Sequence, residues 1–404
     1  MGTLREKLRI LADSAKYDAS CASTANPRGN AAAAPGICHS YTPDGRCISL
    51  LKVLFTNYCV YDCAFCVNRV SNDIPRARFA VDEIVRLTID FYRRNYIDGL
   101  FLSSGIIRSV DYTMEQLVGV ARTLREAHEF AGYIHLKVMP GASPELLREA
   151  GQYADRVSAN IELPTAADMR QLAPDKSHDV IERAMGQIHQ EIAAEEPRSS
   201  RREARAFAPA GQTTQLIVGA TGTADRDILT TADRLYRRHQ LRRVYYTAYS
   251  PIPGQESALV GTPTPLAREH RLYQGDRLMN EYGFSVDELF EDRADLDLRI
   301  DPKLSWALRH PESFPVDVNL ASREQLLRVP GFGRRTVARV LQARRETTLG
   351  LAELRRLGAA LRVARYFITA RGVREQAGRD RLTPEHFLSG AALQQPLPLV
   401  AVGS

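Results

Sequence analysis

Residues 47–69 read CISLLKVLFTNYCVYDCAFCVNR, in which a long apolar run leads directly into three clustered cysteines. The run at 47–56 is almost continuously apolar, which is typical of a parallel strand that is buried on both faces. Cys59, Cys63 and Cys66 follow in a C-x3-C-x2-C spacing, and Phe65 stands directly before the last of them. The stretch therefore predicts a buried strand whose end carries three thiols on one loop.

Three cysteines at these spacings can bind three corners of an iron–sulfur cubane, because the turns between them let the thiolates converge. Such clusters are normally held by four cysteines. An iron without a protein ligand can bind a substrate or cofactor, which an iron with four ligands cannot do. The alternative is a zinc site that takes His39 as its fourth ligand, but structural zinc sites favour paired C-x2-C knuckles and this chain has only one such pair.

Strand-like and helix-like segments alternate along the chain after this stretch. Further strands are expected at 99–103, 133–138, 156–161, 214–218 and 243–249, and helices at 81–94, 113–130, 144–150, 178–194 and 224–239. Six such βα units predict an α/β fold built on a partial (β/α)6 TIM-like barrel. In that architecture the functional groups lie at the carboxyl ends of the strands.

Polar and small residues follow several of the expected strands and are candidate cofactor-binding residues. They are Ser103, Ser104 and Gly105 after the second strand, Lys137 in the third, Asn160 and Glu162 after the fourth, Gly219 after the fifth and Tyr249 at the sixth. The polar groups suit ribose hydroxyls or an amino-carboxylate, and Gly219 would allow an adenine to approach closely. Buried polar groups with internal partners, and an ordinary glycine turn, are the alternatives.

The composition predicts a large globular protein. The chain has 404 residues, of which 44% are hydrophobic and 25% charged, so one large domain and a smaller one are expected. The N-terminal MGTLREKLRI has no signal-peptide pattern, and no run of 18 apolar residues occurs, so we expect a cytoplasmic protein without a membrane partner. In a reducing compartment, clustered cysteines indicate metal ligation before disulfides.

All six cysteines lie in the first 66 residues, and three of them precede the loop. Cys21 and Cys38 fall in a stretch rich in Gly, Pro, Asn and Ser that is expected to be irregular, and Cys47 begins the first strand. Together with His39 or an external ligand, these three could hold a second metal centre, an iron–sulfur cluster or a zinc. Three inert, buried cysteines are the alternative.

Through Cys59, Cys63, Cys66 and Phe65 the chain resembles the radical S-adenosylmethionine (radical SAM) superfamily. The resemblance implies that the three cysteines are catalytic ligands of a [4Fe–4S] cluster. The cluster would cleave SAM reductively to methionine and a 5′-deoxyadenosyl radical, with electrons from a reductant such as flavodoxin or ferredoxin. Members of the superfamily often carry an acid in the turn after the second strand. This chain has none there, so Ser103 and Ser104 are the expected substitutes.

Longer phrases make the resemblance more specific. KYDASC, GICHSYTPDGRCISLLK, RNYIDGLFLSSG, YIHLKVMPGAS, FAPAGQTTQLIVGA, REHRLYQ and DPKLSWALRHP are similar to the family of DNA modification or repair radical SAM proteins, over about residues 7–369. That family pairs the barrel with a C-terminal helix-hairpin-helix. The resemblance implies an enzyme that acts on nucleic acid, with a glycosylase-like protein partner, on a base that is flipped or unpaired.

The C-terminal part has its own charge pattern. Residues 316–381 contain 15 arginines, no lysine and six acidic residues, a net charge of +9 against +6 for the whole chain. The pattern predicts a capped helix at 319–329, a tight hairpin through Gly331 and Gly333, and a second helix at 334–345. The phrase VPGFGRRTVARVL resembles the DNA-binding helix-hairpin-helix, and a weaker second copy is expected at 351–368.

In such a hairpin the glycines would let the backbone approach a phosphate, while Arg334 and Arg335 would add charge contacts that are independent of base sequence. A helical cap that packs on the barrel or on another protein is the alternative. The expected division is an N-terminal helix and cysteine-containing segment at 1–46, the barrel at 47–255, a connecting helical segment at 256–315, an all-α helix-hairpin-helix domain at 316–381 and a tail at 382–404.

Two other functions fit the same patterns. The first is a radical SAM enzyme that acts on RNA or a small metabolite and uses the hairpin to dock a partner. The second is a non-enzymatic iron–sulfur protein that binds DNA. A steep salt dependence of DNA binding would argue against the first, and cleavage of SAM would exclude the second.

Overall fold

The computed structural model describes residues 2–18, 36–42, 45–195, 205–252, 263–372 and 382–388. The chain forms two compact units. Among the described residues, the sheet unit comprises those of Met1–Thr223 and Arg234–Thr264, and the helical unit comprises those of Ala224–Asp233 and Pro265–Pro398. None of the described helices is long and apolar enough to cross a membrane.

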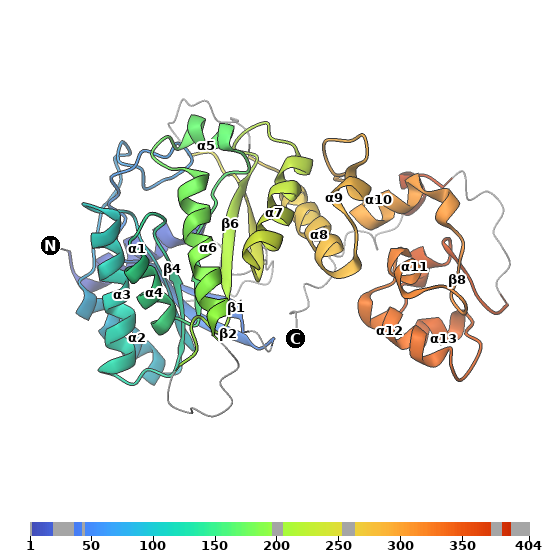
Figure 1. Ribbon diagram of the computed structural model, residues 1–404, viewed down its shortest axis with the longest axis horizontal. Coiled ribbons are helices and arrows are strands. Elements are labelled where there is room, and N and C mark those ends of the chain that lie inside the picture. Colours follow the sequence, from blue (N-terminus) through green and yellow to red (C-terminus); the bar gives the residue numbers. More distant parts are fainter. Residues whose placement is uncertain are drawn as a thin grey trace. The chain divides into compact units, whose positions relative to one another are not determined.

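The sheet unit is built on a seven-stranded sheet whose strands follow the order of the sequence (Figure 1). The strands are β1 (Ile37–Tyr41), β2 (Cys47–Leu54), β3 (Gly99–Ser103), β4 (Tyr133–Lys137), β5 (Arg156–Ser158), β6 (Gln212–Val218) and β7 (Arg243–Ala248). Strands β2 to β7 are parallel, and β1 pairs antiparallel with β2. The six predicted strands are confirmed, although β5 ends at Ser158, and β1 was not predicted.

Helices connect the parallel strands, as the barrel prediction requires. They are α2 (Val81–Arg93), α3 (Val110–Glu126), α4 (Pro144–Tyr153), α5 (Ala166–Leu172), α6 (His178–Ala194) and α7 (Asp225–His239). Because parallel crossovers are right-handed, successive helices lie on the same face of the sheet. Figure 1 shows α2, α3, α4 and α6 as this layer, in which each packs on the next.

Burial of β2 agrees with the apolar pattern from which it was predicted. Leu50 and Leu51 are neighbours whose side chains point to opposite faces of the sheet, and neither has exposed surface. Full burial of such a side chain contributes about 1.5–3 kcal/mol. Helix α1 (Leu4–Ser14) and the short 3-10 helix η1 (Ala15–Tyr17) pack on β2 and carry the N-terminal segment to the sheet.

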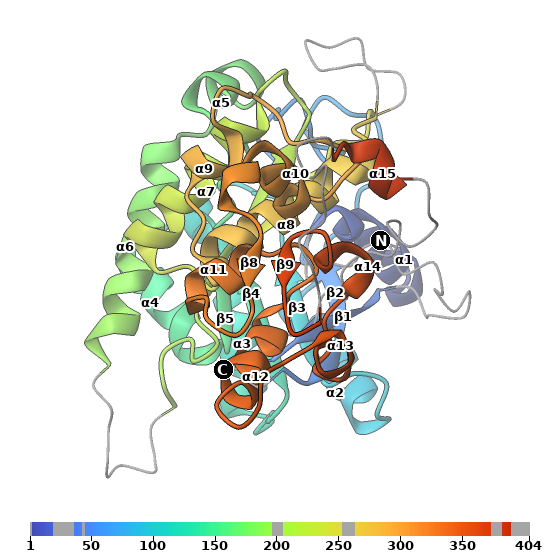
Figure 2. The ribbon, with the colours of Figure 1, turned by 90° about the vertical axis from the view of Figure 1, so that its right-hand side faces the viewer.

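The helical unit consists mainly of short helices. They are α8 (Leu266–Tyr282), α9 (Val286–Phe290), α10 (Pro302–Arg309), η2 (Pro311–Ser313), α11 (Arg323–Arg328), α12 (Arg334–Ala343), α13 (Leu351–Arg356), α14 (Leu361–Ala364) and α15 (Pro384–Leu388). Two short parallel strands, β8 (Val316–Asp317) and β9 (Ile368–Thr369), lie side by side (Figure 2). The prediction of an all-α segment is wrong in this respect, because the ladder ties its two ends together.

Helix α11 is shorter than the predicted helix. It begins after Ser322, whose hydroxyl accepts from the Gln325 amide while the Gln325 side chain accepts from the Ser322 amide. Asn319 lies outside the helix, and its side chain instead accepts from the Leu349 amide and donates to the Leu349 carbonyl. This capping box therefore sets the start of the helix three residues later than the predicted cap.

The turn between α11 and α12 packs against the turn between α13 and α14. Gly331 has a φ of +84°, and a Cβ at this position would lie 2.7 Å from the Ala360 carbonyl oxygen. The Ala360 amide donates to the Gly331 carbonyl at 3.0 Å, and the Thr336 hydroxyl donates to the Gly358 carbonyl at 3.1 Å. Two helical hairpins are thus joined directly by their turns, where the sequence predicted one hairpin and a weaker copy.

Candidate active site

A cavity of about 270 Å³ lies at the carboxyl ends of the parallel strands in the sheet unit. Side chains from the loop after β2 and from the ends of β3, β4, β5 and β7 line it. Of the predicted site residues, the lining includes Cys59, Cys63, Phe65, Cys66, Ser104, Gly105, Lys137, Asn160, Glu162 and Tyr249. The fold therefore brings together residues that are up to 190 positions apart in the sequence.

The three cysteines lie on a folded loop at residues 57–72, which we call the cluster loop. The Cys66 amide donates to the Cys63 carbonyl at 2.9 Å, and the Val60 amide donates to the Ile106 carbonyl at 2.8 Å. Gly105 lies directly beneath the loop, and a Cβ there would come within 2.2 Å of the Tyr58 carbonyl oxygen. Only glycine allows the turn after β3 to approach the cluster loop so closely.

The thiols are partly or fully shielded from solvent, which changes their chemistry. Burial raises the pKa of Cys63 to about 12 and that of Cys66 to about 11. Both are therefore protonated at neutral pH without a metal, and a bound cluster would hold them as thiolates. Three thiols on one loop, open to a cavity, fit a [4Fe–4S] cluster with three protein ligands.

A mononuclear metal fits less well. Among the described residues, no group of three or more His, Cys, Asp or Glu side chains could hold a metal ion. In a cubane each thiolate binds a different iron, so the ligands stand farther apart than those of a single ion. His39 lies on β1, where it pairs with Ser49, and it does not line the cavity. These positions argue against the zinc alternative.

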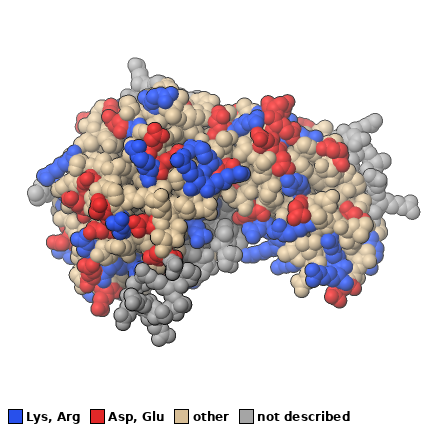
Figure 3. All heavy atoms as spheres, in the orientation of Figure 1, with Lys and Arg blue, Asp and Glu red and all other residues tan. Residues whose placement is uncertain are grey.

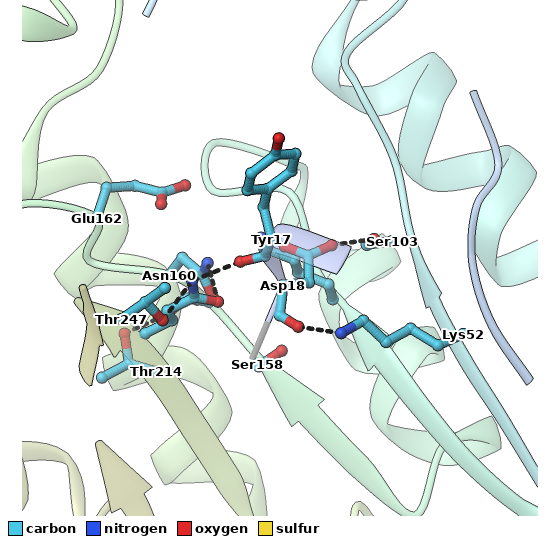
Figure 4. Close-up of polar contacts among 12 residues, drawn as sticks. Tyr17, Asp18, Lys52, Ser103, Ser158, Asn160, Glu162, Thr214 and Thr247 are labelled. Carbon is cyan, nitrogen blue, oxygen red and sulfur yellow. Dashed lines mark hydrogen bonds and ion pairs between the residues drawn. The ribbon is translucent and has the colours of Figure 1, made fainter. Parts of the chain in front are cut away.

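Asp18 brings to the cavity a carboxylate that sequence reasoning missed (Figure 4). Its Oδ2 accepts from the Ser103 hydroxyl at 2.5 Å, and its Oδ1 accepts from Lys137 Nζ at 2.5 Å. Lys52 Nζ donates to its backbone carbonyl. Burial works against the charged form, but the charge and hydrogen bond of Lys137 outweigh it and lower the pKa of Asp18.

The position of Asp18 bears on the role expected of Ser103. The turn after β3 has no acid of its own, but Asp18 reaches the end of that strand from 85 residues earlier in the chain. Ser103 is fully buried and holds Asp18, while the Ser104 hydroxyl donates to the Gly105 carbonyl. Asp18 therefore supplies a carboxylate where the turn has none, while the expected role of Ser103 and Ser104 in binding a cofactor stays a prediction.

Glu162 forms a second, partly buried ion pair in the cavity. It has a φ of +65°, and its Oε1 accepts from Lys176 Nζ at 2.8 Å. Although burial opposes ionisation, Lys176 and then Lys137 lower the pKa of Glu162. Lys176 lies between α5 and α6, and no sequence motif pointed to it. Asp18, Lys137, Glu162 and Lys176 thus place two negative and two positive charges around one cavity.

A hydrogen-bonded network holds the N-terminal segment inside the barrel. Gln215 Nε2 donates to the Tyr17 carbonyl at 2.9 Å and to the Thr247 hydroxyl at 3.0 Å. Asn160 Nδ2 donates to Gln215 Oε1 at 3.4 Å (Figure 4). Asn160 therefore lines the cavity but also has an internal partner, which was the alternative raised from the sequence.

Gly219 is not among the residues that line the cavity. Its φ is +78°, and a Cβ there would lie 2.0 Å from the Thr264 hydroxyl oxygen, which donates to the Val218 carbonyl. The glycine serves a tight turn against Thr264, which was the alternative raised from the sequence, and the adenine contact at Gly219 stays a prediction. Tyr249 follows on β7, is buried, and lines the cavity as expected.

The register of β1 and β2 argues against a second metal centre that binds both Cys38 and Cys47. Cys38 pairs with Leu50, and Cys47 pairs with Tyr41, so the two cysteines are three residues apart along the ladder. That offset is about 10 Å and places their side chains on opposite faces of the sheet. No single centre can bind both. Cys21 lies outside the described residues.

The hairpin between α11 and α12 displays charge as predicted, with one difference. Arg334 and Arg335 are exposed, but Arg334 Nη1 pairs with Glu281 Oε2 at 3.2 Å. The N-terminus of α12 begins after Gly333. Figure 3 shows basic side chains gathered on the helical unit around α12 and α13, where Arg339, Arg355 and Arg356 are also exposed.

Comparison with known proteins leaves the family open. No protein-family model and no curated protein matches the chain. Among solved structures, the FeFe-hydrogenase maturase HydG from Carboxydothermus hydrogenoformans matches with a TM-score of 0.42 at 13% identity, over 56% of this chain and 50% of that one. Methylornithine synthase (PylB) matches with a TM-score of 0.41 at 14% identity, over 75% of this chain and 84% of that one.

The cobalamin-dependent S-adenosylmethionine radical enzyme OxsB matches with a TM-score of 0.33 at 10% identity, over 64% of this chain and 35% of that one. The chain spans about half the length of the HydG structures. At TM-scores below 0.5 these likenesses establish neither a family nor an activity. The function proposed below rests on the residues of this chain.

Proposed function

We propose that this protein is a radical SAM enzyme that cleaves SAM reductively at a [4Fe–4S] cluster held by Cys59, Cys63 and Cys66. The observation that carries the proposal is the shared cavity, in which the three thiols meet charged groups from several strand ends. Three cysteines leave one iron of a cubane without a protein ligand, which is where a cofactor can bind. A structural or electron-transfer cluster would need no such cavity.

A reduced cluster supplies one electron for cleaving the sulfonium carbon–sulfur bond of SAM. The chain supplies the groups that bind and orient SAM. Asp18 and Glu162 can accept from an ammonium group, since a carboxylate has more acceptor sites than the hydrogen bonds that each now receives. Lys137 and Lys176 can donate to a carboxylate. Two acids and two cations therefore suit the zwitterionic amino-carboxylate of the methionyl group.

The apolar part of the cavity keeps water from the reacting atoms. Phe65, Val138, Met139 and Ile217 line it beside the charged groups. A carbon-centred radical must meet a substrate C–H bond before it meets another donor, so exclusion of solvent and close positioning are what the protein has to provide.

The experiment is anaerobic reconstitution with iron and sulfide, followed by incubation with SAM and dithionite. The expected product is 5′-deoxyadenosine, quantified by mass spectrometry. Retention of intact SAM by a protein that has bound four irons per chain would refute the proposal and favour a non-enzymatic iron–sulfur protein.

We further propose that the substrate is a base in DNA, which the helical unit helps to bind. The supporting observation is the group of exposed arginines on α12 and α13 beside two glycine-containing turns. Arginines in such a group bind backbone phosphates, so binding is expected to be tolerant of sequence and sensitive to salt. A base would have to be flipped or unpaired to enter the cavity.

Binding of a fluorescent duplex at several salt concentrations tests this second proposal. The pair Arg335→Glu and Arg339→Glu should weaken binding at least tenfold and reduce the salt slope, since each lost phosphate contact lowers the slope by about 0.9. The matched control is Arg93→Glu with Arg94→Glu, another exposed arginine pair but at the end of α2. Equal effects of the two pairs would favour a small-molecule or RNA substrate and a docking role for the hairpins.

A further inference from the structure

Arg76 binds the cluster loop through four backbone carbonyls. Its Nη1 donates to the Asn57 carbonyl at 2.5 Å and to the Asn68 carbonyl at 2.7 Å. Its Nη2 donates to the Arg69 carbonyl at 2.6 Å and to the Asn72 carbonyl at 2.8 Å. One planar guanidinium thus contacts four peptide groups of the loop that carries the cysteines.

These four carbonyls lie on both sides of the cysteines. Asn57 precedes Cys59, while the other three residues follow Cys66, so Arg76 joins the two ends of the loop. The Ser71 hydroxyl, which donates to Asp62 Oδ1 at 2.6 Å, and the Val70 amide, which donates to the Tyr61 carbonyl at 3.0 Å, also connect the two sides of the loop, but Arg76 alone contacts four of the peptide groups named here. Arginine can make these contacts because its donors form a rigid fork, and hydrogen bonds from a charged donor are roughly twice as strong as neutral ones.

Asn68 connects the hydrogen bonds of Arg76 to a cysteine. Its carbonyl accepts from Arg76 at 2.7 Å, and the N–H of the same peptide group, that of Arg69, donates to the Cys66 carbonyl at 3.2 Å. Solvent exposure and the hydrogen bonds around the cysteine sulfurs are among the features that set the reduction potential of an iron–sulfur cluster. A shift of residue 68 would therefore change both the position of Cys66 and the potential of a cluster bound to it.

The base of the loop is braced from the same segment. The Ala77 amide donates to Asn57 Oδ1 at 2.8 Å, and Asn57 Nδ2 donates to the Pro75 carbonyl at 2.9 Å. The residues around Arg76 therefore hold the start of the loop by their backbone, while the Arg76 side chain contacts its end through Asn68, Arg69 and Asn72. All these contacts are made by the chain itself and need no bound cluster.

We propose that Arg76 is a positioning residue that presets the cluster loop, and through Asn68 the Cys66 ligand, for a cluster of defined potential. This inference rests on the proposed function, since it assumes that the three cysteines hold the cluster. It assigns no contact between Arg76 and substrate. Its consequence is that the loop should lose order in the cluster-free protein when the guanidinium is removed.

The test compares Arg76→Met and Arg76→Lys with the control Arg78→Met. Arg78 lies two residues farther on, and its side chain donates to the Tyr112 hydroxyl at 2.8 Å and packs over Phe55. In cluster-free protein, hydrogen exchange of the amides at 57–72 should be at least tenfold faster in Arg76→Met than in the control. Arg76→Lys should fall between them, since one ammonium cannot reach four carbonyls.

The reconstituted proteins give a second, independent readout. The reduced cluster of Arg76→Met should show an altered electron paramagnetic resonance spectrum and midpoint potential, whereas Arg78→Met should match the wild type. Exchange rates and spectra that are the same in Arg76→Met and Arg78→Met would overturn the inference while leaving the proposed function intact. A wild-type protein that binds no cluster would instead refute the proposed function, and the exchange experiment would still decide whether Arg76 orders the loop.

Discussion

The two regions that carry the described cysteines use the same residue type in opposite ways. Cys59, Cys63 and Cys66 lie on an irregular loop that opens into a cavity. Cys38 and Cys47 lie in a regular antiparallel ladder, where the pleat fixes the face to which each side chain points. Cysteines three or four positions apart can converge from a loop, but cysteines offset by three positions in a ladder cannot.

The two regions also differ in the side chains that surround their cysteines. Cys38 packs on Ile48, Leu50 and Phe101, so it serves as a small apolar side chain, and Cys47 is exposed at the start of β2. The loop cysteines share their cavity with two partly buried ion pairs. Of the two regions, the loop is therefore the one that combines three thiols with groups that could bind a charged cofactor.

The largest effect expected from this contrast is on SAM cleavage. Cys63→Ala should lower 5′-deoxyadenosine formation below detection, because the cluster would lose one of its three ligands. Cys38→Ala and Cys47→Ala should cleave SAM at rates close to that of the wild type. Cleavage that survives in Cys63→Ala would remove the distinction between the two regions.

The metal content of the protein should depend on the loop cysteines and not on Cys38 and Cys47. A variant with Ala at positions 59, 63 and 66, purified without oxygen, should contain neither iron nor zinc when metal and sulfide are counted, since Cys38 and Cys47 face opposite sides of the sheet. Metal that remains in this variant, and is lost when Cys38→Ala is added, would show a centre that uses Cys38 without Cys47.

A smaller effect should come from the charges beside the loop. Burial raises the pKa of Cys63, and Lys176 is the cation that most opposes this rise. Lys176→Met should make the cluster harder to reduce, by about tenfold in the ratio of reduced to oxidised protein at a fixed potential, or ~59 mV for one electron.

One control variant for this effect keeps the positive charge at position 176, and the other removes the negative charge of its partner. Lys176→Arg keeps the charge and should leave the midpoint potential close to that of the wild type. Glu162→Gln leaves Lys176 without its partner and should shift the potential upward. Potentiometric titration measures all three variants, and shifts of the same sign in Lys176→Met and Glu162→Gln would contradict an electrostatic cause.

The smallest expected effect concerns the stability of the ladder. Cys38→Ser places a hydroxyl against an apolar cluster and should lower the free energy of unfolding by about 1 kcal/mol. Cys47→Ser changes an exposed residue and should stay within about 0.5 kcal/mol of the wild type. Denaturant titration distinguishes the two, and equal losses would mean that Cys47 is also packed.

Local pattern was enough to predict much of the sheet unit. Continuous apolar runs predicted β2 and β3, and helical periodicity predicted α2, α3 and α6. Both patterns work because the apolar residues within a segment show which of its faces is buried. The spacing of Cys59, Cys63 and Cys66 predicted the loop, because residues so close together in the sequence can converge without help from distant parts of the chain. Strand ends then indicated Lys137 and Glu162, since parallel strands end at one edge.

Tertiary structure alone decided which distant residues complete the site. Asp18 comes from the N-terminal segment and Lys176 from the connection between α5 and α6. Asp18 lies in the phrase KYDASC, but nothing in the local pattern assigned either residue to the site. Register likewise decided that Cys38 and Cys47 face apart, and a steric contact with Thr264 decided that Gly219 serves a turn. A sequence pattern indicates which face of a single helix or strand is buried and which is exposed to solvent. Ion pairs, strand register and close contacts instead depend on where the fold brings two distant elements together.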